Sequence, residues 1–108
     1  MYSFKALSTK QINDFREGNE IAFKEIYVLF SPKVYAFAYS FLKDQLQSEE
    51  IVQETFLSLW ENRGKFDADK VLEPYLFTIA KRQILDQLRK VISTKKLREN
   101  LLTSIITQ

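Results

Sequence analysis

The stretch SEEIVQETFLSLW, residues 48–60, decides how this chain is expected to fold. Its apolar residues recur at spacings of three and four, which is the pattern of one face of an α-helix. The side of the helical wheel expected to meet a core holds Ile51, Val52, Thr55, Phe56, Leu59 and Trp60. The opposite side holds Glu50, Gln53, Glu54, Leu57 and Glu61. Since residues 44–61 contain no Lys or Arg, the sequence predicts a helix with one acidic face.

The rest of the chain has the same helical period. With 45% apolar residues, two Gly and two Pro among 108, the composition favours long helices over sheets joined by tight turns. Further helices are expected at residues 9–16, ended by Gly18, at residues 20–42 with a new helix or kink at Ser31-Pro32, and from Pro74 to about Ile92. Ser48 is expected to be the N-cap of the acidic helix. The fold class predicted is an all-α compact bundle of four to five helices.

The bundle is expected to occupy residues 1–92, with one core. Its mostly buried residues are predicted to be Tyr35, Phe37, Ala38, Phe41, Ile51, Val52, Phe56, Leu59, Trp60, Leu76, Ala80, Ile84 and Leu88. Residues 93–108 read as weakly helical and detached, either a tail or the start of an interdomain linker.

Several function classes are disfavoured by what the composition lacks. There is no Cys and no His, so disulfides, thiolate metal sites and the commonest general base are excluded. No Gly-rich phosphate loop or paired-carboxylate motif occurs either, and we expect no enzyme, no metal and no cofactor. The first residues have no long apolar segment, which predicts a cytoplasmic protein without membrane insertion.

The net charge of +2 hides a strong asymmetry along the chain. Residues 44–61 hold five acids and no base, whereas residues 81–98 hold seven bases and one acid, Asp86. This split suggests two surfaces for two kinds of partner, although the two segments could also simply neutralise each other. The sequence leaves both alternatives open.

The last long helix, PYLFTIAKRQILDQLRK, has a polar face that combines cations, hydrogen-bonding groups and an aromatic ring. The residues on or beside this face are Tyr75, Thr78, Ile79, Arg82, Gln83, Asp86, Arg89 and Lys90. Such a face suits nucleic acid, because cations meet phosphates and an aromatic ring can stack on an unpaired base. The alternative is a solvated amphipathic helix with cations near its negative end.

Two segments together resemble a known family. QSEEIVQETFLSLWENR and PYLFTIAKRQILDQLRK are similar to region 2 of bacterial extracytoplasmic-function (ECF) RNA polymerase sigma factors, and AFKEIYVLFSPKVYAFAYSFLKD resembles the family's preceding helices. The similarity covers roughly residues 11–90. The long ungapped run E-x-I-V-Q-E-x-F-L-x-L-W makes it specific. The resemblance implies a sigma region 2 fold and a role in transcription initiation.

The resemblance also implies two partners. The acidic helix would dock on the clamp helices of the largest subunit of core RNA polymerase, a basic coiled coil, through Glu50, Gln53, Glu54, Leu57 and Glu61. The last helix would recognise and melt the promoter minus-ten element as single-stranded DNA, through the eight residues of its polar face. The loop at residues 64–73 would form the pocket for a flipped base, with Lys65, Phe66 and Asp67 as candidates. Arg82 departs from the family's usual Asn, which puts the base preference in doubt.

A second hypothesis follows from the missing region 4, the family's minus-thirty-five domain. The chain could be a decoy that binds polymerase or an anti-sigma factor without touching DNA. An anti-sigma factor is also a candidate partner under the first hypothesis. Whether the chain is a fragment or a natural single-domain variant stays open.

Overall fold

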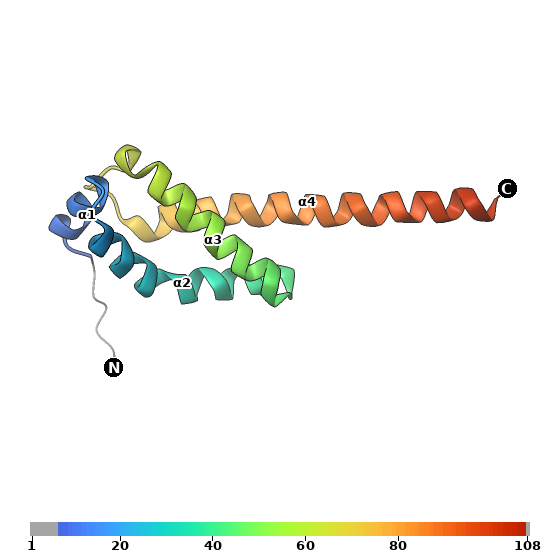
Figure 1. Ribbon diagram of the computed structural model, residues 1–108, viewed down its shortest axis with the longest axis horizontal. Helices are drawn as coiled ribbons and strands as arrows, with labels where there is room; N and C mark the ends of the chain where they lie inside the picture. The colour runs from blue at the N-terminus through green and yellow to red at the C-terminus, as the bar shows by residue number, and fades with distance from the viewer. Residues whose placement is uncertain (1–6, 108) are drawn as a thin grey trace.

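The computed structural model describes residues 7–107, and every regular element in that range is helical. The elements are α1 (Thr9–Arg16), α2 (Glu20–Leu42), α3 (Gln45–Glu61), the short 3-10 helix η1 (Arg63–Lys65) and α4 (Leu72–Ile106). The first three helices and the beginning of α4 pack into one body, from which the rest of α4 projects (Figure 1). The predicted all-α bundle of four to five helices is confirmed. Residues 1–6 of the predicted domain lie outside the described range.

The turn between α1 and α2 is fixed by local hydrogen bonds and one glycine. Ser8 caps α1 in a capping box with Gln11, and the Asn19 side chain accepts a hydrogen bond from the Ala22 N–H at the start of α2. Between them Gly18 has φ +93°, a conformation that side chains with a Cβ rarely adopt. The turn lets α1 fold back on α2, so that Phe15 reaches the core.

Replacing Gly18 with Ala is expected to lower the free energy of unfolding by about 1–2 kcal/mol, because an L-residue is strained at this φ. Steric clash contributes little, since the atom nearest to the position that the new methyl group would take is Arg63 Nε, at 3.5 Å. Urea denaturation followed by circular dichroism measures the change. Gly64→Ala is the control, because Gly64 has no positive φ and a Cβ there would meet open space. Equal losses in the two variants would contradict the explanation.

Three helix boundaries differ from the sequence-based expectation. Helix α3 begins three residues before Ser48, with Asp44 as its N-cap, and Ser48 is instead buried and donates its hydroxyl to the Asp44 carbonyl at 2.7 Å. Helix α2 runs through Pro32, so no separate helix starts at Ser31. Helix α4 starts at Leu72, which places Pro74 in the first turn, where its missing N–H breaks no helical bond.

The end of α4 is also longer than expected. Residues 93–106 continue α4 as regular helix, so the expectation of only weak helicity there was wrong. Every residue from Arg89 to Thr107 is exposed, and this part of α4 extends away from the body (Figure 1). The sequence pattern could not reveal how far the helix continues, because apolar periodicity reports a face that packs, and this part of α4 packs against nothing in residues 7–107.

The core fills the space between α1, α2, α3 and the beginning of α4. Eight of the thirteen residues expected there are buried, namely Ala38, Ile51, Val52, Phe56, Leu59, Leu76, Ala80 and Ile84. Four others, Tyr35, Phe37, Trp60 and Leu88, are partly buried against it. Phe41 was predicted wrongly: it is 54% exposed and touches Phe37 at the edge, with ring centroids 5.3 Å apart. The core also includes residues that the prediction omitted, among them Phe15, Ile26 and Phe66.

Candidate functional site

The acidic face of α3 is fully on the surface. Glu50, Gln53, Glu54, Leu57 and Glu61 are all exposed, and Leu57 keeps 51% of its surface accessible. Within residues 7–107, no Lys or Arg side-chain nitrogen lies within 4.0 Å of a carboxylate oxygen of Glu50, Glu54 or Glu61. The face therefore presents carboxylates that are available to a cationic partner, with Leu57 as an apolar contact among them.

A groove runs beside this face, between α2 and α3. Its volume is about 430 Å³, and it is lined by Glu20, Phe23, Tyr27, Gln53, Phe56, Leu57 and Trp60. The aromatic rings pack on one another: Phe23 lies 4.9 Å from Trp60, and Tyr27 lies 4.9 Å from Phe56, between ring centroids. The groove thus has an apolar, aromatic wall and a rim that carries acid.

The α2 side of the groove was missed by the sequence reasoning. Glu20, Phe23 and Tyr27 are spaced by three and four residues, so they lie on one face of α2. That spacing was visible in the sequence. What it did not reveal is that this face of α2 meets the acidic face of α3.

The carboxyl end of α3 is held in place by an arginine. The Arg63 guanidinium lies 4.2 Å from the centroid of the Trp60 ring, and its Nη1 donates a hydrogen bond to the Trp60 carbonyl at 2.9 Å. This cation–π contact orients the Trp60 ring that forms part of the groove wall.

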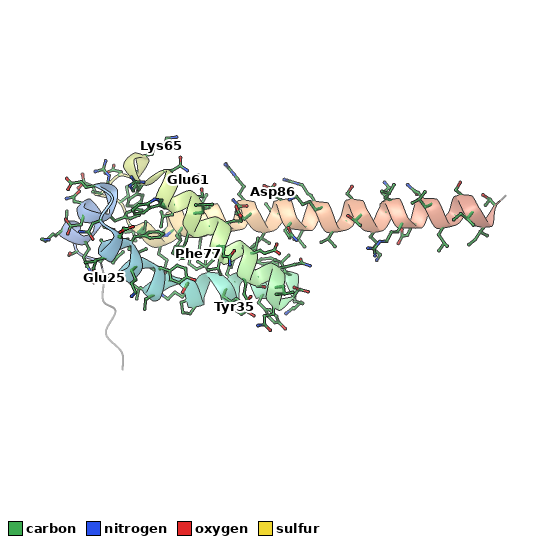
Figure 2. The ribbon with its side chains drawn as sticks, viewed as in Figure 1. Glu25, Tyr35, Glu61, Lys65, Phe77 and Asp86 are labelled. Atoms are coloured by element: carbon green, nitrogen blue, oxygen red, sulfur yellow. The ribbon has the colours of Figure 1, made fainter. Side chains whose placement is uncertain are left out.

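The side chains on the polar face of α4 differ in how far they are exposed to solvent. Thr78, Arg82, Asp86, Arg89 and Lys90 are exposed, whereas Tyr75, Ile79 and Gln83 are half-buried. Arg89 Nη1 lies 3.0 Å from Asp86 Oδ1, an exposed pair of small energetic value that leaves the arginine able to turn to another anion. Figure 2 shows Asp86 where α4 leaves the helical body. Arg82 has no ion-pair partner within residues 7–107.

Tyr75, the aromatic residue at the start of this face, packs on a buried ring. The Tyr75 ring lies 5.0 Å from the Phe66 ring, tilted by 44°, and Phe66 is only 3% exposed. Of the three loop candidates for a flipped-base pocket, Phe66 is therefore a core residue whose ring is not open to a base. Lys65 and Asp67 are exposed, and Asp67 Oδ1 accepts a hydrogen bond from the Asp69 N–H at 2.9 Å.

The two faces differ in charge and lie on different helices of one body. No group of three or more Asp, Glu, His or Cys side chains among residues 7–107 is arranged to hold a metal ion. No helix in the same range is both long and apolar enough to cross a membrane.

Comparison with known proteins gives consistent matches. The family model described as Sigma-70 region 2 matches residues 26–91. SigW, an ECF RNA polymerase sigma factor of Bacillus subtilis (strain 168), is 30% identical over 81 residues, covering 75% of this chain and 43% of SigW. CarQ, an RNA polymerase sigma factor of Myxococcus xanthus, is 32% identical over 75 residues, covering 69% of this chain and 43% of CarQ. The chain therefore spans less than half the length of these two curated relatives.

A solved structure has the same fold. The NMR structure of an engineered region 2 of sigmaE in complex with GTAAAA aligns with a TM-score of 0.73 at 20% sequence identity. The alignment covers 89% of this chain and 98% of that one. At this level of identity the match establishes the arrangement of the helices.

Proposed function

The chain belongs to the sigma-70 region 2 family, and from this we propose that it is a transcription-initiation module that docks on core RNA polymerase through α3 and binds the promoter minus-ten element through α4. The observation that carries the proposal is the separation of two surfaces on one family fold. An acidic face without ion pairs to any cation of residues 7–107 lies on one helix, and a cationic face with an aromatic ring lies on another.

Docking on polymerase would use Glu50, Gln53, Glu54, Leu57 and Glu61. The family resemblance implies that the partner is the basic coiled coil of the largest subunit. Exposed carboxylates that pair with no cation in the described part of the chain favour such a partner, because complementary charge speeds encounter and fixes orientation. The groove next to Leu57 offers room for an apolar side chain of the partner helix.

Minus-ten DNA would lie along the exposed cations of α4. Arg82, Arg89 and Lys90 would meet phosphates, while Thr78, Gln83 and Asp86 would supply hydrogen-bonding groups near the bases. Tyr75 is half-buried on Phe66, so one part of its ring is held rigidly and the rest can stack on an unpaired base. Lys65 and Asp67 would border a flipped base from the loop.

The module would act by binding alone. Unstacking a base has a cost of a few kcal/mol, which stacking and phosphate contacts to the open strand offset. A protein that binds the open strand better than the duplex shifts the equilibrium toward opening without catalysing a reaction. Such a module works in the cytoplasm, where polymerase and promoter DNA are found.

The direct test measures binding to core RNA polymerase and to a labelled minus-ten non-template strand, each across a salt series. We expect binding to both, with the DNA affinity falling as salt rises. A chain that binds polymerase and shows no salt-sensitive DNA binding would be the decoy, and the proposed role of α4 would be rejected.

Replacing Arg82 and Arg89 with Ala is expected to weaken binding to the minus-ten strand roughly tenfold or more. It should also reduce the slope of log K against log salt by about 0.7 for each lost phosphate contact. Fluorescence anisotropy at several salt concentrations measures both quantities. Lys10→Ala with Lys24→Ala is the matched control, since it removes the same charge from exposed positions on α1 and α2. If the control lowers affinity and slope equally, the binding depends on net charge and not on α4.

A further inference from the structure

The projecting part of α4 carries an apolar surface that nothing in residues 7–107 covers. Seven large apolar side chains are exposed there, from 44% at Val91 to 73% at Ile106, and the others are Ile92, Leu97, Leu101, Leu102 and Ile105. Scattered apolar residues on a surface are ordinary, but here they are concentrated on one unsupported segment. Helices in proteins gain most of their stability from tertiary packing and this segment has none within residues 7–107, so packing against a partner surface would stabilise it.

The segment is amphipathic and basic. Leu97, Leu101 and Ile105 recur every four residues and form one stripe. Arg98 lies beside this stripe, and Lys90 lies in line with it, two turns before Leu97. Residues 90–106 hold four cations, Lys90, Lys95, Lys96 and Arg98, against one acid, Glu99. Two such segments would repel each other by charge, so pairing of one with another is disfavoured.

The same chain offers a surface complementary to this segment. The groove between α2 and α3 has an aromatic wall, Leu57 at its edge, and Glu20 in its lining. Helix α3, which forms one side, carries Glu49, Glu50, Glu54 and Glu61 and no Lys or Arg. An amphipathic helix that brings leucines flanked by cations matches an apolar groove flanked by carboxylates.

We propose that two copies of this chain associate, with residues 90–106 of α4 from one copy lying in the groove between α2 and α3 of the other. Leu97, Leu101 and Ile105 fill the groove, and Arg98 and Lys90 face the carboxylates of α3. The straight course of α4 favours a second copy over the chain's own groove, because folding back would require the helix to break after it leaves the body (Figure 1).

Self-association has a consequence for the proposed function. The groove adjoins the face assigned to polymerase, so a docked α4 segment covers it and polymerase binding competes with association. This consequence rests on the proposed function, whereas the association itself does not. The tests below therefore use the protein alone.

Analytical ultracentrifugation over a concentration series measures the association. We expect the mean mass to rise above the 12.8 kDa of one chain, with an affinity that weakens as salt rises. Leu101→Glu and Leu57→Glu, which alter the two sides of the contact, should each weaken association at least tenfold. Val71→Glu is the control, since Val71 is 73% exposed and belongs to neither surface. All three positions are exposed, so circular dichroism should show folded protein in every case.

Disulfide trapping identifies the two surfaces, because the native chain contains no Cys. A mixture of Gln53→Cys and Ser104→Cys chains should form a mixed disulfide under mild oxidation, while Gln53→Cys mixed with Thr103→Cys should not, since Thr103 lies across the helix from the leucine stripe.

A constant mass of one chain at all concentrations would overturn the proposal. Loss of association in Leu101→Glu but not in Leu57→Glu would overturn it in favour of α4 pairing with α4. A disulfide within one chain carrying both cysteines, at a dilution where the mass is that of one chain, would overturn it in favour of fold-back.

Discussion

Reversing two charges on α3, Glu50→Lys with Glu54→Lys, is expected to weaken binding to core RNA polymerase about a hundredfold or more. Both side chains are exposed and have no cation within 4.0 Å in the described part of the chain, so the native fold does not depend on their charge. In the proposed complex each introduced lysine would face a basic coiled coil, and like charges placed together cost several kcal/mol. Surface plasmon resonance against immobilised core polymerase measures the change.

Two controls separate docking from other effects of charge. Glu17→Lys with Glu25→Lys makes the same change in net charge at exposed positions of the turn after α1 and of α2, away from the acidic face, and should retain near-native affinity. Affinity of the α3 variant for the minus-ten strand should not fall, because the proposed DNA face lies on α4. The measurements belong at protein concentrations at which the mass is that of one chain. Full polymerase affinity in the α3 variant would show that α3 is not the docking helix.

Replacing Leu76 with Ala is expected to lower the free energy of unfolding by about 3–4 kcal/mol. Leu76 is completely buried in the core, so the truncation removes apolar contacts and leaves a cavity lined by its neighbours. A domain of this size is stable by about 5–15 kcal/mol, and the variant would lose a large part of that margin. Urea denaturation measures the loss as a shift of the midpoint at unchanged slope.

Leu85→Ala is the matched control for this cavity. Leu85 is on the same helix and allows the same chemical change, but it is 42% exposed. We expect a loss below about 1 kcal/mol there, because solvent fills the space that the methyl groups vacate. Similar losses at both positions would mean that helix propensity, and not core packing, sets the stability of α4.

The sequence was a good guide to the helices and to the family. The spacing in residues 48–60 predicted both faces of α3, and Ile51, Val52, Phe56 and Leu59 are indeed buried while the acidic residues are exposed. Periodicity succeeds here because α3 lies between solvent and a core, so its two sides differ sharply in polarity. The ungapped similarity to region 2 then assigned the family, which the family model confirms.

Helix boundaries and the edge of the core were harder to predict. Asp44 and Ser48 are both good N-caps, and only the packing of α3 shows that Ser48 is buried within it. Phe41 and Phe56 look equally suited to a core, yet Phe41 lies near the end of α2, with more than half of its surface exposed. Local sequence cannot distinguish the members of either pair, since the burial of a residue depends on which distant elements of the chain pack against it.

The assigned roles of the site residues remain proposals, and sequence and structure contribute to them differently. The helical class, the family and the charge on each face follow from the residues alone, because spacing and composition are local properties. The folded arrangement was needed to show that Phe66 packs beneath Tyr75 in the core, that Phe23 and Tyr27 complete a groove beside Leu57, and that residues 93–106 project as unpacked helix. Each of these depends on contacts, or their absence, between segments that are distant in sequence, and no local pattern encodes such contacts.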